Sequence, residues 1–304
     1  MVNLSDEIGR LLNASISSNT KALYESALRS FNQFQSLFTI DYSWPVPLSH
    51  ILWFIAFHSN KGSTPNTVKS YLAAISYIHK LHNWEDPTSL FIVKRALEGF
   101  KRLKGTPDVR APITYDLLEK IDRILKLICN SPYETLLFKT AFCLTFFGLF
   151  RVGEVVYTSI KSQSPLLVSD MSVTDKGLEV ILPRSKTDQY GRSTKLFIPK
   201  IQGSSVCPYG NMVSYMKIRP GNPGLLFIHK NNSPLTRYQF SAILRKAIIY
   251  LGIPHQNFKS HSFRIGAATT LSMKGISDEV IQRLGRWKSK AYTTYIRMDK
   301  IIGS

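Results

Sequence analysis

Apolar side chains in the first hundred residues recur at intervals that predict helices. Two runs keep the helical period of about 3.6 residues, and a third is apolar on almost every side, as in a core helix. Asn19-Thr20 and Thr64-Pro65 stand where two of these helices begin. No stretch alternates with a period of 2, so we expect an all-α bundle. The runs cover about residues 20–34, 50–58, 65–78 and 89–103.

Residues 112–304 predict further helices around one short β region. Apolar, β-branched runs at Leu178–Leu182 and Lys195–Ile198 flank a turn-rich segment, which predicts a β-hairpin. Leu225–His229 predicts another short strand, and Tyr133–Val156 a long buried helix. We therefore expect a mainly α fold with a small β-hairpin or sheet (α+β). Further helices are expected from Thr114 and over 211–217, 235–251, 261–273 and 277–285.

Proline and glycine divide these two parts. The segment Lys101–Pro112 is basic and contains Gly105, Pro107 and Pro112, as linkers often do. We place a helical domain at 1–104, a linker at 105–111 and a larger domain at 112–304. A helical module joined by a basic linker to a larger basic domain suggests a clamp that closes around a DNA duplex.

The charge supports a polyanionic partner. Lys and Arg number 39 against 20 Asp and Glu, a net charge of +19. Such an excess on a folded chain favours nucleic acid. An anionic membrane surface is the competing interpretation, but a basic amphipathic helix with exposed aromatics is missing from the sequence. An ordinary solvated face explains the basic residues of 1–104 equally well. The candidate DNA contacts are Lys69, Arg95, Lys101, Arg102, Arg184, Arg192, Arg237 and Arg245.

Cysteine usage and hydropathy exclude several classes of protein. The three cysteines are unclustered, which favours a reducing compartment, and no metal-ligand spacing is present. The first 13 residues are polar, so we expect no cleavable signal peptide. The most apolar run, Ala141–Phe150, is about half as long as a membrane span, so we expect a core helix and no membrane partner.

Arg151 is the first candidate for chemistry, because it directly follows that apolar run. A charge there is costly unless it is paired, and Glu154 is the obvious partner. One interpretation is a structural ion pair at a helix end. The other is an arginine held by Glu154 and offered to a phosphate, whose oxygens its planar fork can bind in pairs.

The second candidate is the stretch His261–Tyr295. His261 and Arg264 stand three apart and could reach one anion from a single helix face. Trp287 and Tyr295 follow, and Lys186 lies earlier, near the tip of the hairpin. Each residue alone has an ordinary interpretation: a capping pair, a half-buried aromatic ring or a solubilising lysine.

Together, these residues resemble a known constellation. Arg151, Lys186, His261-x-x-Arg264, Trp287 and Tyr295 resemble, in order and approximate spacing, the active site of the tyrosine recombinase/λ-integrase superfamily. The phrases HSFRIGAA, RSKTDQ and LGRWKSKAYTTYIR are most similar to recombinases of eukaryotic Crypton, DIRS and Ngaro mobile elements. The resemblance covers the whole chain, with 1–104 similar to a core-binding domain and 112–304 to the catalytic domain.

The resemblance implies a site-specific recombinase or integrase acting on double-stranded DNA in the nucleus. Tyr295 would attack a phosphodiester and form a 3′-phosphotyrosyl link, without metal, ATP or another cofactor. Arg151 and Arg264 would hold the phosphate oxygens, and Lys186 would protonate the leaving 5′-oxygen. His261 would handle the tyrosine proton or bind the phosphate. Self-association as a dimer or tetramer on paired sites is also implied.

One position departs from the family pattern. The His or Trp of most relatives lies nine residues before the nucleophile, where this chain has Arg286, and Trp287 lies eight before Tyr295. We expect Trp287 to cover the phosphate pocket and Arg286 to point outward to DNA or solvent; Arg286 taking part directly is the alternative. Two other functions stay open: a type IB topoisomerase, and a domesticated DNA-binding protein that does not cleave.

Overall fold

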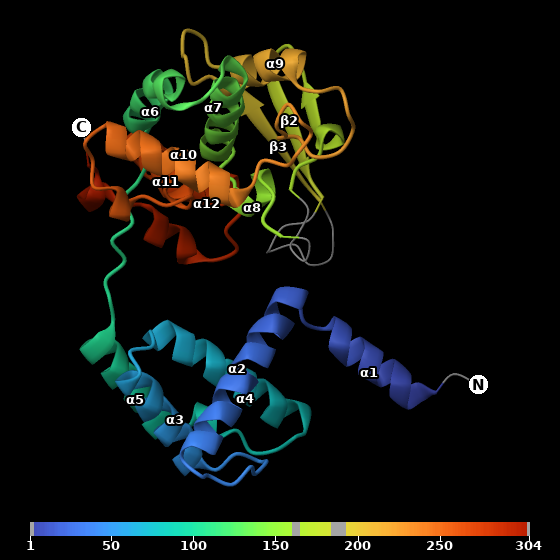
Figure 1. Ribbon diagram of the computed structural model, residues 1–304, viewed down its shortest axis with the longest axis vertical. Coiled ribbons are helices and arrows are strands. Elements are labelled where there is room, and N and C mark those ends of the chain that lie inside the picture. Colours follow the sequence, from blue (N-terminus) through green and yellow to red (C-terminus); the bar gives the residue numbers. More distant parts are fainter. Residues whose placement is uncertain (1–2, 160–164, 184–192, 303–304) are drawn as a thin grey trace. The chain divides into compact units, whose positions relative to one another are not determined.

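The computed structural model describes residues 3–159, 165–183 and 193–302, and the chain forms two compact units, Met1–Asp108 and Val109–Ser304 (Figure 1). Both units are built mainly from helices, and the second contains a small antiparallel sheet. The expected fold class is therefore confirmed. The division falls within the predicted linker, although its last residue, Ala111, is fully buried in the second unit.

The N-terminal unit packs its helices around phenylalanine side chains. Phe31 and Phe54 are fully buried and meet edge to face with ring centroids 5.1 Å apart. Thr64 caps its helix as predicted. The helix predicted to begin at Asn19-Thr20 begins instead at Ser18, and its cap is Ser17, whose hydroxyl accepts from the Thr20 amide. The helices are α1 (Leu4–Ala14), α2 (Ser18–Leu37), α3 (Leu48–Asn60), α4 (Pro65–Leu81) and α5 (Phe91–Lys104). We did not predict α1.

The C-terminal unit is organised around α7 (Pro132–Phe147), which is buried along most of its length. The predicted helix through Val156 is wrong, because the chain turns at Gly148 and at Leu149, which has a left-handed φ of 46°. A separate short helix, α8 (Val152–Val155), follows Arg151. The other helices are α6 (Tyr115–Ile128), α9 (Pro208–Ile218), α10 (Arg237–Tyr250), α11 (Ser262–Met273) and α12 (Asp278–Leu284).

The predicted hairpin is present as two strands of a three-stranded sheet. β2 (Gly177–Leu182) pairs with β3 (Thr194–Pro199), and β1 (Met171–Val173), which we did not predict, adds to the other edge of β2. The strand predicted at Leu225–His229 is wrong. That segment makes only isolated bridges, because side chains of α9 and its C-cap take its carbonyl groups: Arg219 bonds those of Leu225 and Leu226.

α11 reaches the centre of this unit because one position on it lacks a side chain. A Cβ on Gly266 would overlap the backbone of Ile113, so only glycine allows this approach. The contact is fixed by the Ile113 amide, which donates to the Ser262 carbonyl at 3.0 Å. α11 also packs against α7, which brings His261 and Arg264 to the end of α7 that leads into Arg151.

Candidate active site

His261 and Tyr295 meet directly. The Nε2 atom of His261 lies 2.9 Å from the Tyr295 hydroxyl oxygen, a hydrogen-bond distance, and the ring centroids are 5.0 Å apart. His261 is the N-cap of α11, and Tyr295 ends the 3₁₀ helix η4 (Lys290–Tyr295). Both side chains are partly exposed. The structure therefore brings together the proton-handling residue and the nucleophile that the resemblance implies.

The Tyr295 segment is held in place by its backbone and by one aromatic neighbour. The Thr269 hydroxyl donates to the Tyr295 carbonyl at 3.2 Å and accepts from the Arg297 amide at 3.0 Å, which ties η4 to α11. The Trp287 ring packs at 4.9 Å from the Tyr295 ring, between centroids. These contacts fix the position of the phenol relative to His261. We missed Thr269 in the sequence, where an isolated threonine within a helix gives no signal.

Tyr292, the neighbouring tyrosine, has a different environment. It is buried, and its hydroxyl donates to a carboxylate oxygen of Asp278 at 3.1 Å. Burial and that carboxylate raise the pKa of Tyr292. A buried phenol whose hydroxyl is held by Asp278 is less available to an external phosphate than the partly exposed Tyr295 beside His261. The geometry thus favours Tyr295 over Tyr292.

His261 is a neutral imidazole at ordinary pH. Burial lowers the pKa of His261 to about 4, and the cations of Arg110, Arg264, Arg151 and Arg297 add to the shift. A neutral ring has one nitrogen with a free lone pair. When that nitrogen is Nε2, it can accept the Tyr295 proton across the 2.9 Å contact.

Arg264 is enclosed. Its side chain is fully buried, and its terminal nitrogens donate to the carbonyls of Leu149 and Gly285. The guanidinium carbon also lies 4.4 Å from the centroid of the Trp287 ring and 5.7 Å from that of Tyr295. Burial, with Arg151 and Arg286 nearby, lowers the pKa of Arg264 to about 9. The Arg264 guanidinium therefore lies over the Tyr295 ring. Its contact with a phosphate stays a prediction.

Glu154 is paired with Arg151, as predicted. Glu154 Oε1 accepts from the Arg151 guanidinium at 3.0 Å, and Oε2 accepts from the Arg151 amide at 2.9 Å. The carboxylate side chain is only 6% exposed, whereas that of Arg151 is 24% exposed. Arg151 thus keeps donors on the accessible side of the pair, as an arginine that is offered to an anion must.

Arg286 does not point outward, so that expectation is wrong. Its guanidinium donates to Glu154 Oε2 at 3.0 Å and to the carbonyls of Gly148 and Leu149 at 3.0 and 3.1 Å. The side chain is only 7% exposed. The turn after α7 leaves the carbonyl groups of Gly148 and Leu149 free to accept hydrogen bonds next to Glu154. Bonds to these acceptors stabilise the Arg286 side chain more than the weak attraction between a cation and the end of its own helix.

Trp287 is buried, as expected. Besides the Tyr295 and Arg264 contacts, its ring occupies the space beside Gly285, where a Cβ would overlap the indole. The indole N–H is buried and has no hydrogen-bond partner among the described residues. Trp287 therefore packs against both the Arg264 guanidinium and the ring of the partly exposed Tyr295.

The assembled site carries excess positive charge. Arg151 and Arg286 both pair with the carboxylate of Glu154, Arg264 bonds only backbone carbonyls among the described residues, and His261 is neutral. Buried cations in such excess are costly unless an anion joins them. The arrangement thus favours a bound anion next to the Tyr295 phenol.

The other predicted site residues are not among those described above. Lys186, Arg184 and Arg192 fall outside the residues that the structure describes. The remaining candidate DNA contacts are all exposed, and Arg102 is paired with Glu98 at 3.5 Å. The exposed residues are Lys69, Arg95, Lys101, Arg102, Arg237 and Arg245.

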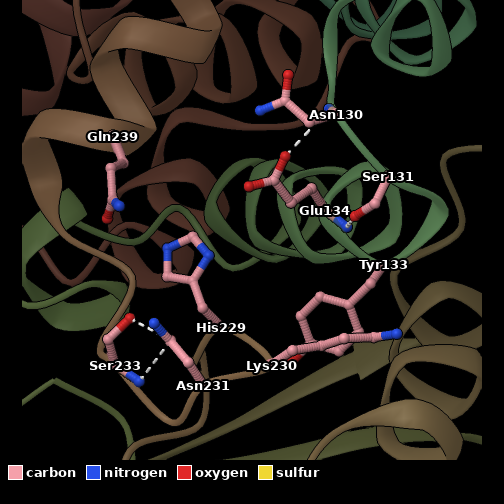
Figure 2. A pocket seen from close by; sticks show the side chains of 9 residues that line it. All are labelled: Asn130, Ser131, Tyr133, Glu134, His229, Lys230, Asn231, Ser233 and Gln239. Carbon is pink, nitrogen blue, oxygen red and sulfur yellow. Dashed lines mark hydrogen bonds between the residues drawn. The ribbon is translucent and has the colours of Figure 1, made fainter.

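A separate hollow of about 400 Å³ lies at the N-terminal end of α7 (Figure 2). Tyr133, Glu134, His229 and Lys230 are among the residues that line it, and none of the His261–Tyr295 group is. It therefore does not belong to the candidate active site. In the described ranges 3–159, 165–183 and 193–302, no cluster of His, Cys, Asp and Glu suits a metal ion, and no helix is long and apolar enough to cross a membrane.

Comparison with known proteins identifies one matching protein family and a similar sequence. The model of the phage integrase family matches residues 117–300, which contain every residue of the site described above. An integrase/recombinase XerD homologue of Selenomonas ruminantium is 26% identical over 252 residues, covering 78% of this chain and 69% of the relative.

Solved structures share the fold at low sequence identity. The XerH recombinase in a post-cleavage complex with palindromic difH has a TM-score of 0.66 at 15% identity, with 92% of this chain and 76% of that chain covered. A λ integrase dimer on a COC′ core site has a TM-score of 0.63 at 17% identity, with coverages of 95% and 75%. The Tn1549 transposon integrase with circular-intermediate DNA has a TM-score of 0.62 at 15% identity, with coverages of 92% and 90%.

Proposed function

The chain belongs to the phage integrase family of tyrosine recombinases, and from that premise we propose that it cleaves and rejoins DNA strands at specific sites through Tyr295. The observation that carries the proposal is the 2.9 Å contact between Tyr295 and a neutral His261, beside an excess of buried arginines. A phenol next to a proton acceptor and an anion-binding cluster suits attack on a phosphodiester.

In the proposed step, the Tyr295 oxygen attacks phosphorus and the bond to the 5′-oxygen breaks. The phenol proton passes to His261, and the 5′-oxygen takes a proton from Lys186. The product is a 3′-phosphotyrosyl link with a free 5′-hydroxyl, which can attack in the reverse direction to rejoin strands. Arg151 stabilises the negative charge that grows on the non-bridging phosphate oxygens. Arg264, which lies over the Tyr295 ring, is proposed to stabilise the same charge.

The proton path depends on the protonation state of His261. A phenol has an ordinary pKa near 10, so at neutral pH its proton must leave during attack. An imidazolium could not accept that proton. Burial and the surrounding arginines keep His261 neutral, and its Nε2 lies within hydrogen-bond reach of the phenol.

Tyr295 is proposed to act within its own chain. Its contacts with His261, Thr269 and Trp287 all come from the same polypeptide. A nucleophile donated to a neighbouring copy would have to give up these contacts first. Cleavage in cis is therefore the arrangement that the described contacts support.

Double-stranded DNA and further copies of the chain are the proposed partners. The charge of +19 favours a polyanion, and the XerH, λ integrase and Tn1549 integrase neighbours are described as DNA complexes, the λ integrase as a dimer. A dimer or tetramer on paired sites, closing as a clamp on the duplex, follows by analogy with them.

The finer assignment rests on sequence phrases alone. HSFRIGAA, RSKTDQ and LGRWKSKAYTTYIR are the basis for proposing a Crypton, DIRS or Ngaro element and a nuclear location. Imaging of the tagged full chain in eukaryotic cells tests the location. Exclusion from the nucleus would contradict it.

Trapping of covalent complexes tests the proposed reaction. The full chain is incubated with nicked duplexes carrying candidate terminal repeats, and adducts that survive denaturant are mapped by peptide mass spectrometry. We expect adduct on Tyr295, with and without EDTA. Tyr295→Phe should form none, whereas Tyr292→Phe, the matched control, should form adduct.

Each alternative has its own outcome. Relaxation of supercoiled plasmid by a monomer, without any need for paired sites, would favour a type IB topoisomerase. Binding without adduct on every duplex would favour a domesticated DNA-binding protein. Adduct on Tyr292, or cleavage lost in EDTA, would overturn the proposed chemistry.

A further inference from the structure

We propose that α1 of one copy of this chain docks into an apolar groove on the N-terminal unit of a second copy. The groove has a volume of about 420 Å³ and lies between the C-terminal half of α2 and α3. It is lined by Phe34, Phe38, Ile40, Trp53, Ala56, Phe57 and Asn60. The inference names surfaces for the self-association proposed above and does not depend on the cleavage chemistry.

α1 has an apolar face without a partner. Leu4, Ile8, Leu11 and Leu12 are spaced so that they share one side of the helix, and they are 74, 56, 57 and 42% exposed. No residue of α1 is buried, and Figure 1 shows α1 as a separate helix ahead of α2. A helix this short gains little stability alone in water, so burial of this face is what stabilises it.

The groove offers the complementary surface. Phe38 and Trp53 are 58% and 53% exposed, although both are large aromatics. The floor is Phe34, which is buried and packs against Phe38 and Phe57 with centroid distances of 5.5 Å. An aromatic-lined groove that takes aliphatic side chains spaced three and four residues apart is a known way of binding a helix.

Charge argues for a protein occupant and against DNA or lipid. α1 carries Asp6 and Glu7 against one arginine, Arg10, which Glu7 already holds at 2.7 Å. A helix with net negative charge is repelled by phosphate, in DNA or in a membrane surface. At the groove, Lys61 lies over the Phe57 ring at 5.4 Å, where it can face the acidic first turn of α1.

The connection to α2 is too short for α1 to fill the groove of its own copy. Phe34 and Phe38 lie about 24 and 30 Å along α2 from Ser18, at about 1.5 Å per residue. A fully extended Ser15–Ser17 spans about 10 Å, and Ile8 lies about 9 Å further down α1. Ile8 therefore falls short of Phe34, so a second copy is the occupant.

Site-directed crosslinking tests this contact. One tagged chain carries Ile8→Cys and a differently tagged chain carries Ala56→Cys, both in a Cys129→Ser background, because Cys143 and Cys207 are buried. A short bismaleimide is added to the mixed full-length chains, with and without duplex DNA. We expect a product that contains both tags. Asn13→Cys, on the opposite face of α1, is the matched control and should give at least tenfold less.

Two variants test the same contact without crosslinker. Leu11→Asp and Ala56→Glu change exposed positions and leave the packed core intact. Each should shift the sedimentation profile on DNA from the assembled species to a single bound copy, with the affinity of that single copy changed less than twofold.

Three outcomes would overturn the docking: equal crosslinking from Ile8→Cys and Asn13→Cys, no product that contains both tags, or unchanged assembly in both charge variants. None of them touches the proposed recombinase activity, which depends on adduct formation at Tyr295. Conversely, a chain that crosslinks as expected but never forms adduct would support the docking and overturn the proposed function.

Discussion

Arg286 donates to the carboxylate of Glu154 at 3.0 Å, so a residue nine positions before Tyr295 is tied to the helix that begins after Arg151. Glu154 holds Arg151 with its other oxygen at 3.0 Å. One buried carboxylate thus connects the phosphate-binding candidate to the segment that carries the nucleophile. The register position where most relatives have His or Trp serves here as a link between the two.

The first prediction concerns this link. Arg286→Ala removes the buried donor that bonds Glu154 Oε2 and the carbonyls of Gly148 and Leu149. Because a buried ion pair is broken, we expect the free energy of unfolding to fall by about 3 kcal/mol. Urea denaturation of the full chain measures it. Arg283→Ala, which changes an exposed arginine in the last turn of α12, just before Arg286, is the control and should change stability by about 0.5 kcal/mol or less. Equal, small effects in both variants would contradict a structural role for Arg286.

The link also predicts how cleavage responds. At saturating DNA and a temperature where it is folded, Arg286→Ala should slow single-turnover cleavage about tenfold to a hundredfold, because Arg151 loses part of its support. Trp287→Ala should slow it similarly by freeing the Tyr295 ring, with stability reduced by about 3 kcal/mol. Normal cleavage by folded Trp287→Ala would show that the ring only fills space.

A further prediction concerns the pH response of His261. Its folded-state pKa is lowered from 6.5 to about 4, so the unfolded chain binds this proton more readily. The stability from a neutral His261 is therefore fully present above about pH 6.5 and is lost as pH falls towards 4. NMR titration of the free chain should show the His261 ring signal moving near pH 4. His261→Gln identifies the signal, and a midpoint between pH 6 and 7 would refute the neutral imidazole.

Much of this arrangement could be predicted from local patterns. Helix starts at Thr64, Thr114 and Ser131 have hydroxyl caps that a sequence displays directly. The end of α7 could not be predicted, since the apolar run continues to Phe150 while the helix stops at Phe147. Only the left-handed turn at Leu149 ends it, and that turn exposes the carbonyls that Arg264 and Arg286 use.

Long-range partners explain the remaining errors in the site. Arg286 reads as an exposed cation at a helix end, because its acceptor Glu154 is 132 residues away in sequence. Arg264 reads as one of a pair with His261, yet its partners are the carbonyls of Leu149 and Gly285. The family resemblance depended on the identity and order of these residues. Their hydrogen-bond partners could be found only from the folded structure.

Salt dependence gives a prediction about DNA binding. Each phosphate that the chain neutralises contributes a slope of about −0.9 to log K against log salt. Lys101→Ala removes an exposed cation and should make the slope about one unit shallower. Arg10→Ala removes a cation already held by Glu7 and should leave the slope unchanged. Fluorescence anisotropy on one duplex measures both, and a wild-type slope near zero would rule out a clamp on DNA.

The last prediction separates cleavage in cis from cleavage in trans. Tyr295 contacts His261, Thr269 and Trp287 of its own chain, so the nucleophile and the arginine cluster that serves it belong to one copy. Arg151→Ala keeps the phenol but loses a phosphate ligand, and Tyr295→Phe keeps the ligand but loses the phenol. Neither variant should form adduct alone, and cleavage in cis requires that their mixture stay inactive as well.

A positive control is needed to interpret the absence of adduct in this mixture. Wild-type chain mixed with either variant should still form adduct, because an intact copy needs nothing from its neighbour for the chemical step. Mass spectrometry of differently tagged chains identifies which copy carries the DNA. Adduct on the Arg151→Ala chain, appearing only when Tyr295→Phe is added, would mean that Tyr295 leaves His261 and enters the site of a neighbour. The hydrogen bonds from Thr269 to the Tyr295 carbonyl and from the Arg297 amide to Thr269 would then have to open before each cleavage. Because both bonds join α11 and η4 of one chain, we expect them to stay closed and the mixture to remain inactive.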